Sequence, residues 1–132
     1  MSSTKYLNET QTEIALFFQT RVRERIVYLL SSKKRGEFFG KLAHTAEKYI
    51  DCKLITEKSS RPLAPEELAK RLGGTVYVIA EHSELDGRFT DIGTALDELW
   101  SCGVPYLLYG NGLLYVETEY DFSVHSSYLL KR

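Results

Sequence analysis

The spacing of apolar residues changes along the chain, and this change constrains the fold more than any other feature. From Thr10 to Leu30, apolar residues recur at steps of three and four, the period of an amphipathic helix. The segment 34–50 repeats that period. From Thr75 onward, apolar residues gather in short β-branched and aromatic runs, which are typical of strands. The sequence therefore predicts helices first and a sheet second.

Local signals mark the ends of several elements in the second half. Pro65 and Gly73 bound a short helix, because proline favours the first turn of a helix and glycine its end. Asp91 is placed to cap a further helix that Gly103 ends. The apolar runs PYLLY and LLYVE flank Gly-Asn-Gly, so a tight hairpin is predicted over 105–117.

Together these elements predict a single α+β domain over residues 1–132. The run 75–80 is interpreted as a buried central strand, 56–62 as a polar loop and 122–130 as a last strand. We expect an N-terminal helical pair packed on a mostly antiparallel sheet of three to five strands. The expected arrangement has two layers, with the helix that carries Trp100 beside the sheet.

The composition is that of an ordinary globular protein. The 132 residues are 43% hydrophobic and 27% charged, and the two cysteines lie far apart without metal-binding spacing. We therefore expect reduced cysteines and no cofactor. The N-terminal residues lack an apolar signal core, and no apolar run reaches the roughly 18 residues of a membrane span. A cytoplasmic protein with no membrane partner is predicted.

The net charge of −1 hides an uneven distribution of charged residues. Residues 1–72 hold 14 Lys and Arg against 9 Asp and Glu, a net of +5, whereas residues 73–132 hold 3 against 9, a net of −6. The basic half could bind an anionic partner. The two halves could equally attract each other, either within one fold or across a dimer.

One polar cluster follows the predicted strand 75–80, at a strand end where ligand sites are common. Carboxylates beside a histidine could bind a divalent metal or act as an acid and base, and the candidates are Glu81, His82, Glu84, Asp86 and Asp91. A structural turn is the alternative, because Asp86-Gly87 is a favourable pair for a tight turn.

A second group of candidates is basic. Arg21 and Arg25 fall within the apolar arc of the first predicted helix, and Lys34 and Arg35 follow it. These residues could bind an anion, because arginine can donate two hydrogen bonds to one carboxylate or phosphate. The alternative is that they pair with acidic groups of the C-terminal half or of a second subunit.

Nucleic acid is a weaker candidate partner. PEELAKRLG resembles the first helix of a helix-turn-helix domain, and ALDELWSCG followed by a hairpin has the outline of a recognition helix and wing. However, the strand-like run 75–80 stands where the second helix should be. The would-be recognition helix also carries Asp97 and Glu98, which phosphates would repel.

Tyrosines are frequent in the predicted hairpin and the last strand. They could form a binding face or a dimer contact, although core packing is the favoured interpretation.

Three stretches of the chain resemble a family of small uncharacterised bacterial proteins that also occur as integron gene-cassette cargo. These stretches are RVRERIVYLLSSKKRGEFFGKLAH, GGTVYVIAEHSELDGRFTDIGTALDELW, and GNGLLYVETE before SSYLLKR. The resemblance implies a bacterial, cytoplasmic accessory protein and transfers no site residues.

The favoured function is a non-enzymatic binding or interaction module, acting as a homodimer on a protein or small ligand. This hypothesis follows from the lack of a convergent catalytic motif in the sequence. The alternatives are a small enzyme or metal-binding protein that uses the loop 81–91, and a winged-helix-like nucleic-acid-binding protein.

Overall fold

A computed structural model describes residues 9–31, 35–118 and 126–132. Its helices are α1 (Glu9–Ala15), α2 (Arg23–Ser31), α3 (Arg35–Thr45), α4 (Pro65–Leu72) and α5 (Ile92–Leu99). Its strands are β1 (Ile55–Ser59), β2 (Thr75–Ala80), β3 (Phe89–Asp91), β4 (Tyr106–Gly110), β5 (Leu113–Glu117) and β6 (Ser127–Lys131). None of the helices in the described ranges is both long and apolar enough to cross a membrane.

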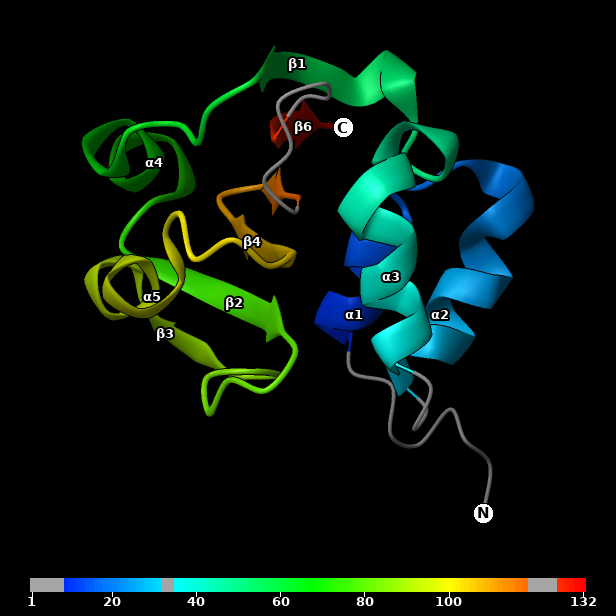
Figure 1. The fold of residues 1–132 in the computed structure, drawn as a ribbon, viewed down its shortest axis with the longest axis horizontal. Coiled ribbons are helices and arrows are strands. Elements are labelled where there is room, and N and C mark those ends of the chain that lie inside the picture. The colour runs from blue at the N-terminus through cyan, green and yellow to red at the C-terminus, as the bar shows by residue number, and fades with distance from the viewer. Residues whose placement is uncertain (1–8, 32–34, 119–125) are drawn as a thin grey trace.

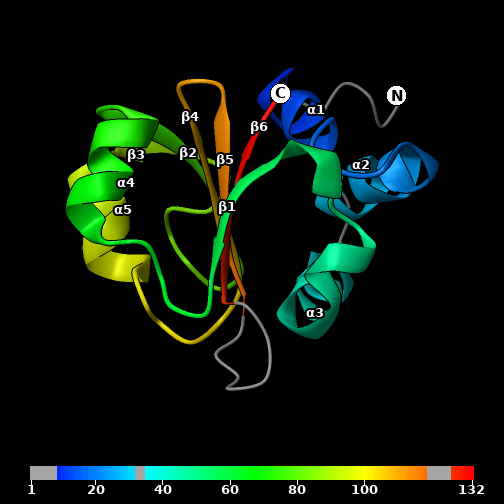
Figure 2. The same cartoon turned by 90° about the horizontal axis from the view of Figure 1, so that it is seen from above.

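The strands form one antiparallel sheet of six, in the order β1-β6-β5-β4-β2-β3. Helices α1–α3 cover one face, and α4 and α5 cover the other (Figure 1). Seen from above, the sheet is the middle of three layers (Figure 2). The predicted α+β class is confirmed, while the prediction of three to five strands in two layers is wrong.

The third layer is explained by strands in which apolar and polar residues do not alternate. In β2, Tyr77 and Ile79 belong to the core beneath α1–α3, whereas Val76, Val78 and Ala80 belong to the core beneath α4 and α5. A strand buried on both faces needs apolar residues at every position. The continuous apolar run that predicted a buried strand therefore also indicated a cover on each side of the sheet.

The extra strands lie at the two edges of the sheet, where the sequence is polar. β1 occupies most of the predicted loop 56–62 and pairs with β6. β3 has three residues, lies next to the acidic loop and pairs with β2. Edge strands have one solvated side and are often short or charged, so their sequences carry little strand signal.

The first predicted helix, 10–30, is interrupted in the structure. Between α1 and the 3-10 turn η2 (Thr20–Val22), the chain extends and Phe18 forms an antiparallel bridge with Ile50. The amide of Asp51 donates to the carbonyl of Phe17 at 2.9 Å. The apolar period persists across the break because Phe17 and Phe18 are both buried. The second predicted helix, 34–50, corresponds to α3 and the 3-10 turn η3 (Ala46–Lys48).

Tyrosine hydroxyls connect the sheet to the N-terminal helical layer. Tyr109 donates to Glu13 and Tyr128 donates to Glu47, each at 2.8 Å. The rings of Tyr106, Tyr115 and Tyr128 are buried, and that of Tyr109 packs partly buried at the edge of the core. The core-packing interpretation of the aromatic hairpin is therefore confirmed.

The predicted hairpin is present, and it lies in the middle of the sheet. Asn111 and Gly112 have φ values of 53° and 73°, as a tight hairpin turn requires. β4 pairs with β2 on one side and β5 pairs with β6 on the other. A wing must project freely to reach a nucleic acid, so the winged-helix interpretation does not fit this fold.

Candidate functional site

The acidic loop does not bring its five candidate side chains together. The side chain of His82 is almost fully exposed, at 89%, and its ring nitrogen lies 3.8 Å from the carboxylate of Glu81. Glu84 lies in the same turn, between β2 and β3. The described residues contain no group of three or more His, Cys, Asp or Glu that could hold a metal ion.

Asp86 and Asp91 have structural partners. The carboxylate of Asp86 accepts two hydrogen bonds from the Arg35 guanidinium, one of them at 2.7 Å, and a third from the amide of Ala80 at 2.9 Å. The carboxylate of Asp91 accepts hydrogen bonds from the hydroxyl of Thr94 at 2.7 Å and from its amide at 2.9 Å, which caps α5, and these bonds lower the pKa of Asp91. The pair with Arg35 therefore holds the loop against α3, and Gly87 has the positive φ, 74°, that the predicted Asp86-Gly87 turn requires.

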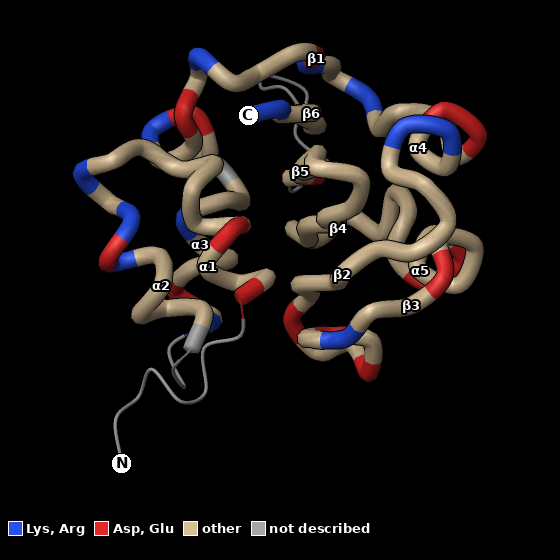
Figure 3. Tube along the Cα trace, turned by 180° about the vertical axis from the view of Figure 1, so that it is seen from behind, with Lys and Arg blue, Asp and Glu red and all other residues tan. Residues whose placement is uncertain are grey.

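The basic candidates that the structure describes also pair within the chain. Arg25 binds Glu37 at 3.0 Å on the surface, and Arg21 donates to the carbonyl of Lys48 at 3.1 Å. Lys34 lies outside the described residues. Figure 3 shows basic positions along the α2 and α3 side and acidic positions at the turn between β2 and β3. The pair Arg35–Asp86 joins the two oppositely charged halves.

Glu117, at the end of β5, has the most unusual environment of the polar residues, and it is not among the residues predicted from the sequence. Its side chain is buried, with 2% of the residue exposed, and it lies directly opposite Tyr106 in the β4–β5 pairing. The hydroxyls of Tyr106 and Tyr115 both donate to its Oε2 atom, the latter at 3.0 Å. A carboxyl group is thus enclosed within the α4–α5 side of the sheet.

The environment of Glu117 has opposing effects on its charge. Burial raises the pKa of Glu117 because it disfavours the ionised form, while hydrogen bonds from Tyr106, Tyr115 and the backbone of Ser101 oppose this rise. Burial and the neighbouring carboxylate raise the pKa of both tyrosines far above the ordinary value. The two phenols therefore remain protonated donors at neutral pH.

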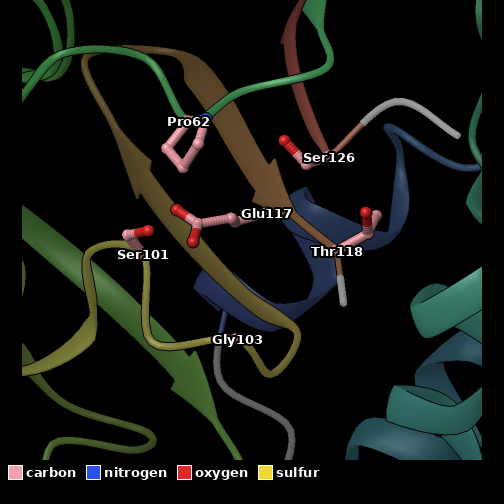
Figure 4. A pocket seen from close by; sticks show the side chains of 6 residues that line it. All are labelled: Pro62, Ser101, Gly103, Glu117, Thr118 and Ser126. Atoms are coloured by element: carbon pink, nitrogen blue, oxygen red, sulfur yellow. The ribbon is translucent and has the colours of Figure 1, made fainter. Parts of the chain in front are cut away.

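Glu117 lies at a pocket of about 170 Å³. The pocket walls come from the segment before α4, the loop after α5 and the ends of β5 and β6, and the lining residues are Pro62, Ser101, Gly103, Glu117, Thr118 and Ser126. Figure 4 shows the Glu117 carboxylate pointing between Pro62 and Ser101, with Ser126 across the hollow. Ser126 is 2% exposed, and its hydroxyl has no hydrogen-bond partner within the described ranges of the chain.

Hydrogen bonds fix the walls of this pocket. The indole of Trp100 donates to the carbonyl of Leu63, and the hydroxyl of Ser127 donates to the carbonyl of Arg61, each at 2.7 Å. These two bonds hold the chain on both sides of Pro62. The amide of Ser126 donates to the carbonyl of Ser59 at 2.8 Å. The pocket is therefore formed in advance of any ligand.

The sequence carried one signal for this site. In the predicted hairpin, Glu117 shares a strand face with Tyr115, and the short turn places it opposite Tyr106. A carboxyl group among buried aromatic residues is uncommon enough to mark a candidate. Nothing in the sequence showed that Pro62 and Ser126 reach the same point, because these residues are far apart in the chain.

Comparison of the chain with protein-family models, with curated proteins and with solved structures finds no match in any of the three. The resemblance to small bacterial cassette proteins stays a prediction. The assignment of the site therefore depends on the geometry around Glu117.

Proposed function

We propose that this protein is a binding domain that takes a small polar ligand into the Glu117 pocket. The observation that carries the proposal is the hydroxyl of Ser126, which is buried, lines the pocket and has no hydrogen-bond partner among the described residues. A buried hydroxyl without a hydrogen bond costs about 1–3 kcal/mol. A ligand that bonds to this hydroxyl offsets that cost, which favours binding in the pocket.

The pocket restricts the size of the ligand. Its volume of about 170 Å³ is smaller than that of most sites for drug-sized molecules, which occupy ~300–1,000 Å³. Among the described lining residues, polar side chains come from Glu117, Ser101, Thr118 and Ser126. The proposed ligand is therefore a compound of few heavy atoms with several hydrogen-bonding groups. The fixed walls favour binding, because little conformational freedom is lost when the ligand enters.

A fragment screen followed by protein NMR tests this proposal. Small polar compounds are titrated into the ¹⁵N-labelled full chain, and the shifted amides are mapped on the structure. We expect the largest shifts at Ser101, Gly103 and Ser126, and weaker affinity in Ser126→Ala. The matched control is Glu47→Gln, which alters another tyrosine-bonded carboxylate outside the pocket. The proposal fails if compounds bind elsewhere, or if Ser126→Ala leaves every affinity unchanged.

A further inference from the structure

We propose that the ligand of this pocket is a small organic cation, an ammonium or amidinium compound whose N–H groups bind the Glu117 carboxylate and the Ser126 hydroxyl. This inference depends on the proposed function, and it adds the chemical class of the ligand. It comes from three properties of the pocket as the described residues form it: the charge of Glu117, the hydrogen-bonding groups and the single carboxylate.

The charge of the Glu117 carboxylate favours a cationic ligand. Each ion pair found among the described residues joins other side chains, and the described partners of Glu117 are two phenols and a backbone group. The neighbouring thiol of Cys102 also has a raised pKa, because of burial and the charge of Glu117, and is therefore neutral at pH 7. An ionised carboxylate that is buried without a counter-ion is costly. A cation in the pocket would stabilise it.

The hydrogen-bond acceptors of the pocket favour a ligand that carries donors. A carboxylate offers about four acceptor positions. Both tyrosines use Oε2, and the backbone of Ser101 supplies one further hydrogen bond. At least one acceptor position of Glu117 therefore remains for a ligand. The Ser126 hydroxyl oxygen is a second acceptor at the same hollow. Ammonium and amidinium groups carry only donors, so they match this pair of acceptors.

The lining of the pocket suits an organic cation better than a metal ion. Calcium and magnesium bind several oxygen ligands, usually including more than one carboxylate. Among the described residues, the lining of this pocket contains one carboxylate, that of Glu117, and three hydroxyls, those of Ser101, Thr118 and Ser126. Such a set is better suited to an organic cation that donates directed hydrogen bonds.

Binding of a cation is coupled to the protonation of Glu117. Among the described residues, the titratable groups that face this carboxyl are Tyr106 on β4, Tyr115 on β5 and Cys102 after α5, and all three are neutral at pH 7. Of these four groups, Glu117 is therefore the one that carries charge at the site. Affinity for a cation should rise with pH as Glu117 ionises, whereas affinity for a neutral compound should not.

Matched pairs of compounds separate charge from shape. Acetamidinium is compared with acetamide, and ethylammonium with ethanol, by NMR titration of the full chain at constant ionic strength. We expect each cation to bind at Ser101 and Ser126 at least about tenfold more tightly than its neutral partner, the ratio that corresponds to one charge-assisted hydrogen bond. Glu117→Gln should remove this ratio, because the amide retains an acceptor for the tyrosines but carries no charge. Glu47→Gln should preserve it.

The outcomes distinguish the two proposals. If acetamide and ethanol bind in the pocket as tightly as the cations, the inference of a cationic ligand is overturned and the binding function stands. If the cations bind tightly in Glu117→Gln, the inference is likewise overturned. If no compound of either charge shifts the pocket amides, the proposed function fails. A thermal-unfolding curve for each variant confirms that the protein is folded before the comparison.

Discussion

Replacing Asp86 with alanine tests whether the acidic loop has a structural role. Asp86 accepts two hydrogen bonds from Arg35 and one from the amide of Ala80, and the two charged side chains are only 21% and 24% exposed. A partly buried hydrogen bond to a charged group contributes about 1.5–3 kcal/mol, and bonds that share one carboxylate are not additive. We therefore expect Asp86→Ala to lower the free energy of unfolding by about 2–3 kcal/mol.

Urea denaturation followed by circular dichroism measures this change. The matched control is Glu37→Ala, because Glu37 also accepts two hydrogen bonds from an arginine, Arg25, but both side chains are about half exposed. Exposed pairs contribute about 0.2–1 kcal/mol, so the control should change stability little. An equal loss of stability in the two variants would refute the reasoning, since burial would then have no effect on the strength of these pairs.

Three further predictions concern the packing and charge of other residues. In Gly110→Ala, a Cβ atom would lie 2.5 Å from the carbonyl oxygen of Leu72, so thermal unfolding should show a loss of about 1–3 kcal/mol; an unchanged midpoint would contradict this close approach. Asp91→Ala removes the cap of α5, so amide hydrogen exchange at Thr94 should become faster, and unchanged exchange would count against the cap. Burial raises the folded-state pKa of Glu117 above its unfolded value of about 4.3, so the contribution of this residue to stability is present at lower pH and is lost as pH rises through the folded pKa. Relative to Glu117→Gln, the natural protein should lose stability in urea denaturation as the pH rises above that unfolded value, and a pH-independent difference would be evidence against the raised pKa.

The elements with strong local signals could be predicted from the sequence. Pro65 and Asp91 mark the starts of α4 and α5 because proline fixes a helical backbone angle and aspartate accepts an orphan amide. The hairpin followed from its turn residues and the apolar runs on both sides. Such signals depend on a few neighbouring residues, so they survive in almost any tertiary structure.

The layers and the edge strands depend on contacts between distant segments. The segment of β1 is polar, and its pairing with β6 is decided by a strand about 70 residues further along the chain. The break after α1 is set by the bridge from Phe18 to Ile50. Local propensity is a weak guide where long-range pairing or packing decides the conformation.

The candidate site could not be predicted from the sequence for the same reason. Residues that attract attention in a sequence, such as His82 and Glu84, are polar residues in an exposed turn. Glu117 gains its unusual properties only from its surroundings, because burial and two tyrosine hydroxyls change the behaviour of an ordinary side chain. The sequence could place Glu117 on the core face of a strand, but it could not place Ser126 beside it.

A crystal structure of the full chain with acetamidinium, at a concentration well above the dissociation constant from NMR, tests the central claim most directly. The account predicts electron density for the compound in the pocket, with its N–H groups within hydrogen-bonding distance of the Glu117 carboxylate and the Ser126 hydroxyl. Acetamidinium bound elsewhere, with only water between Glu117 and Ser126, would contradict it.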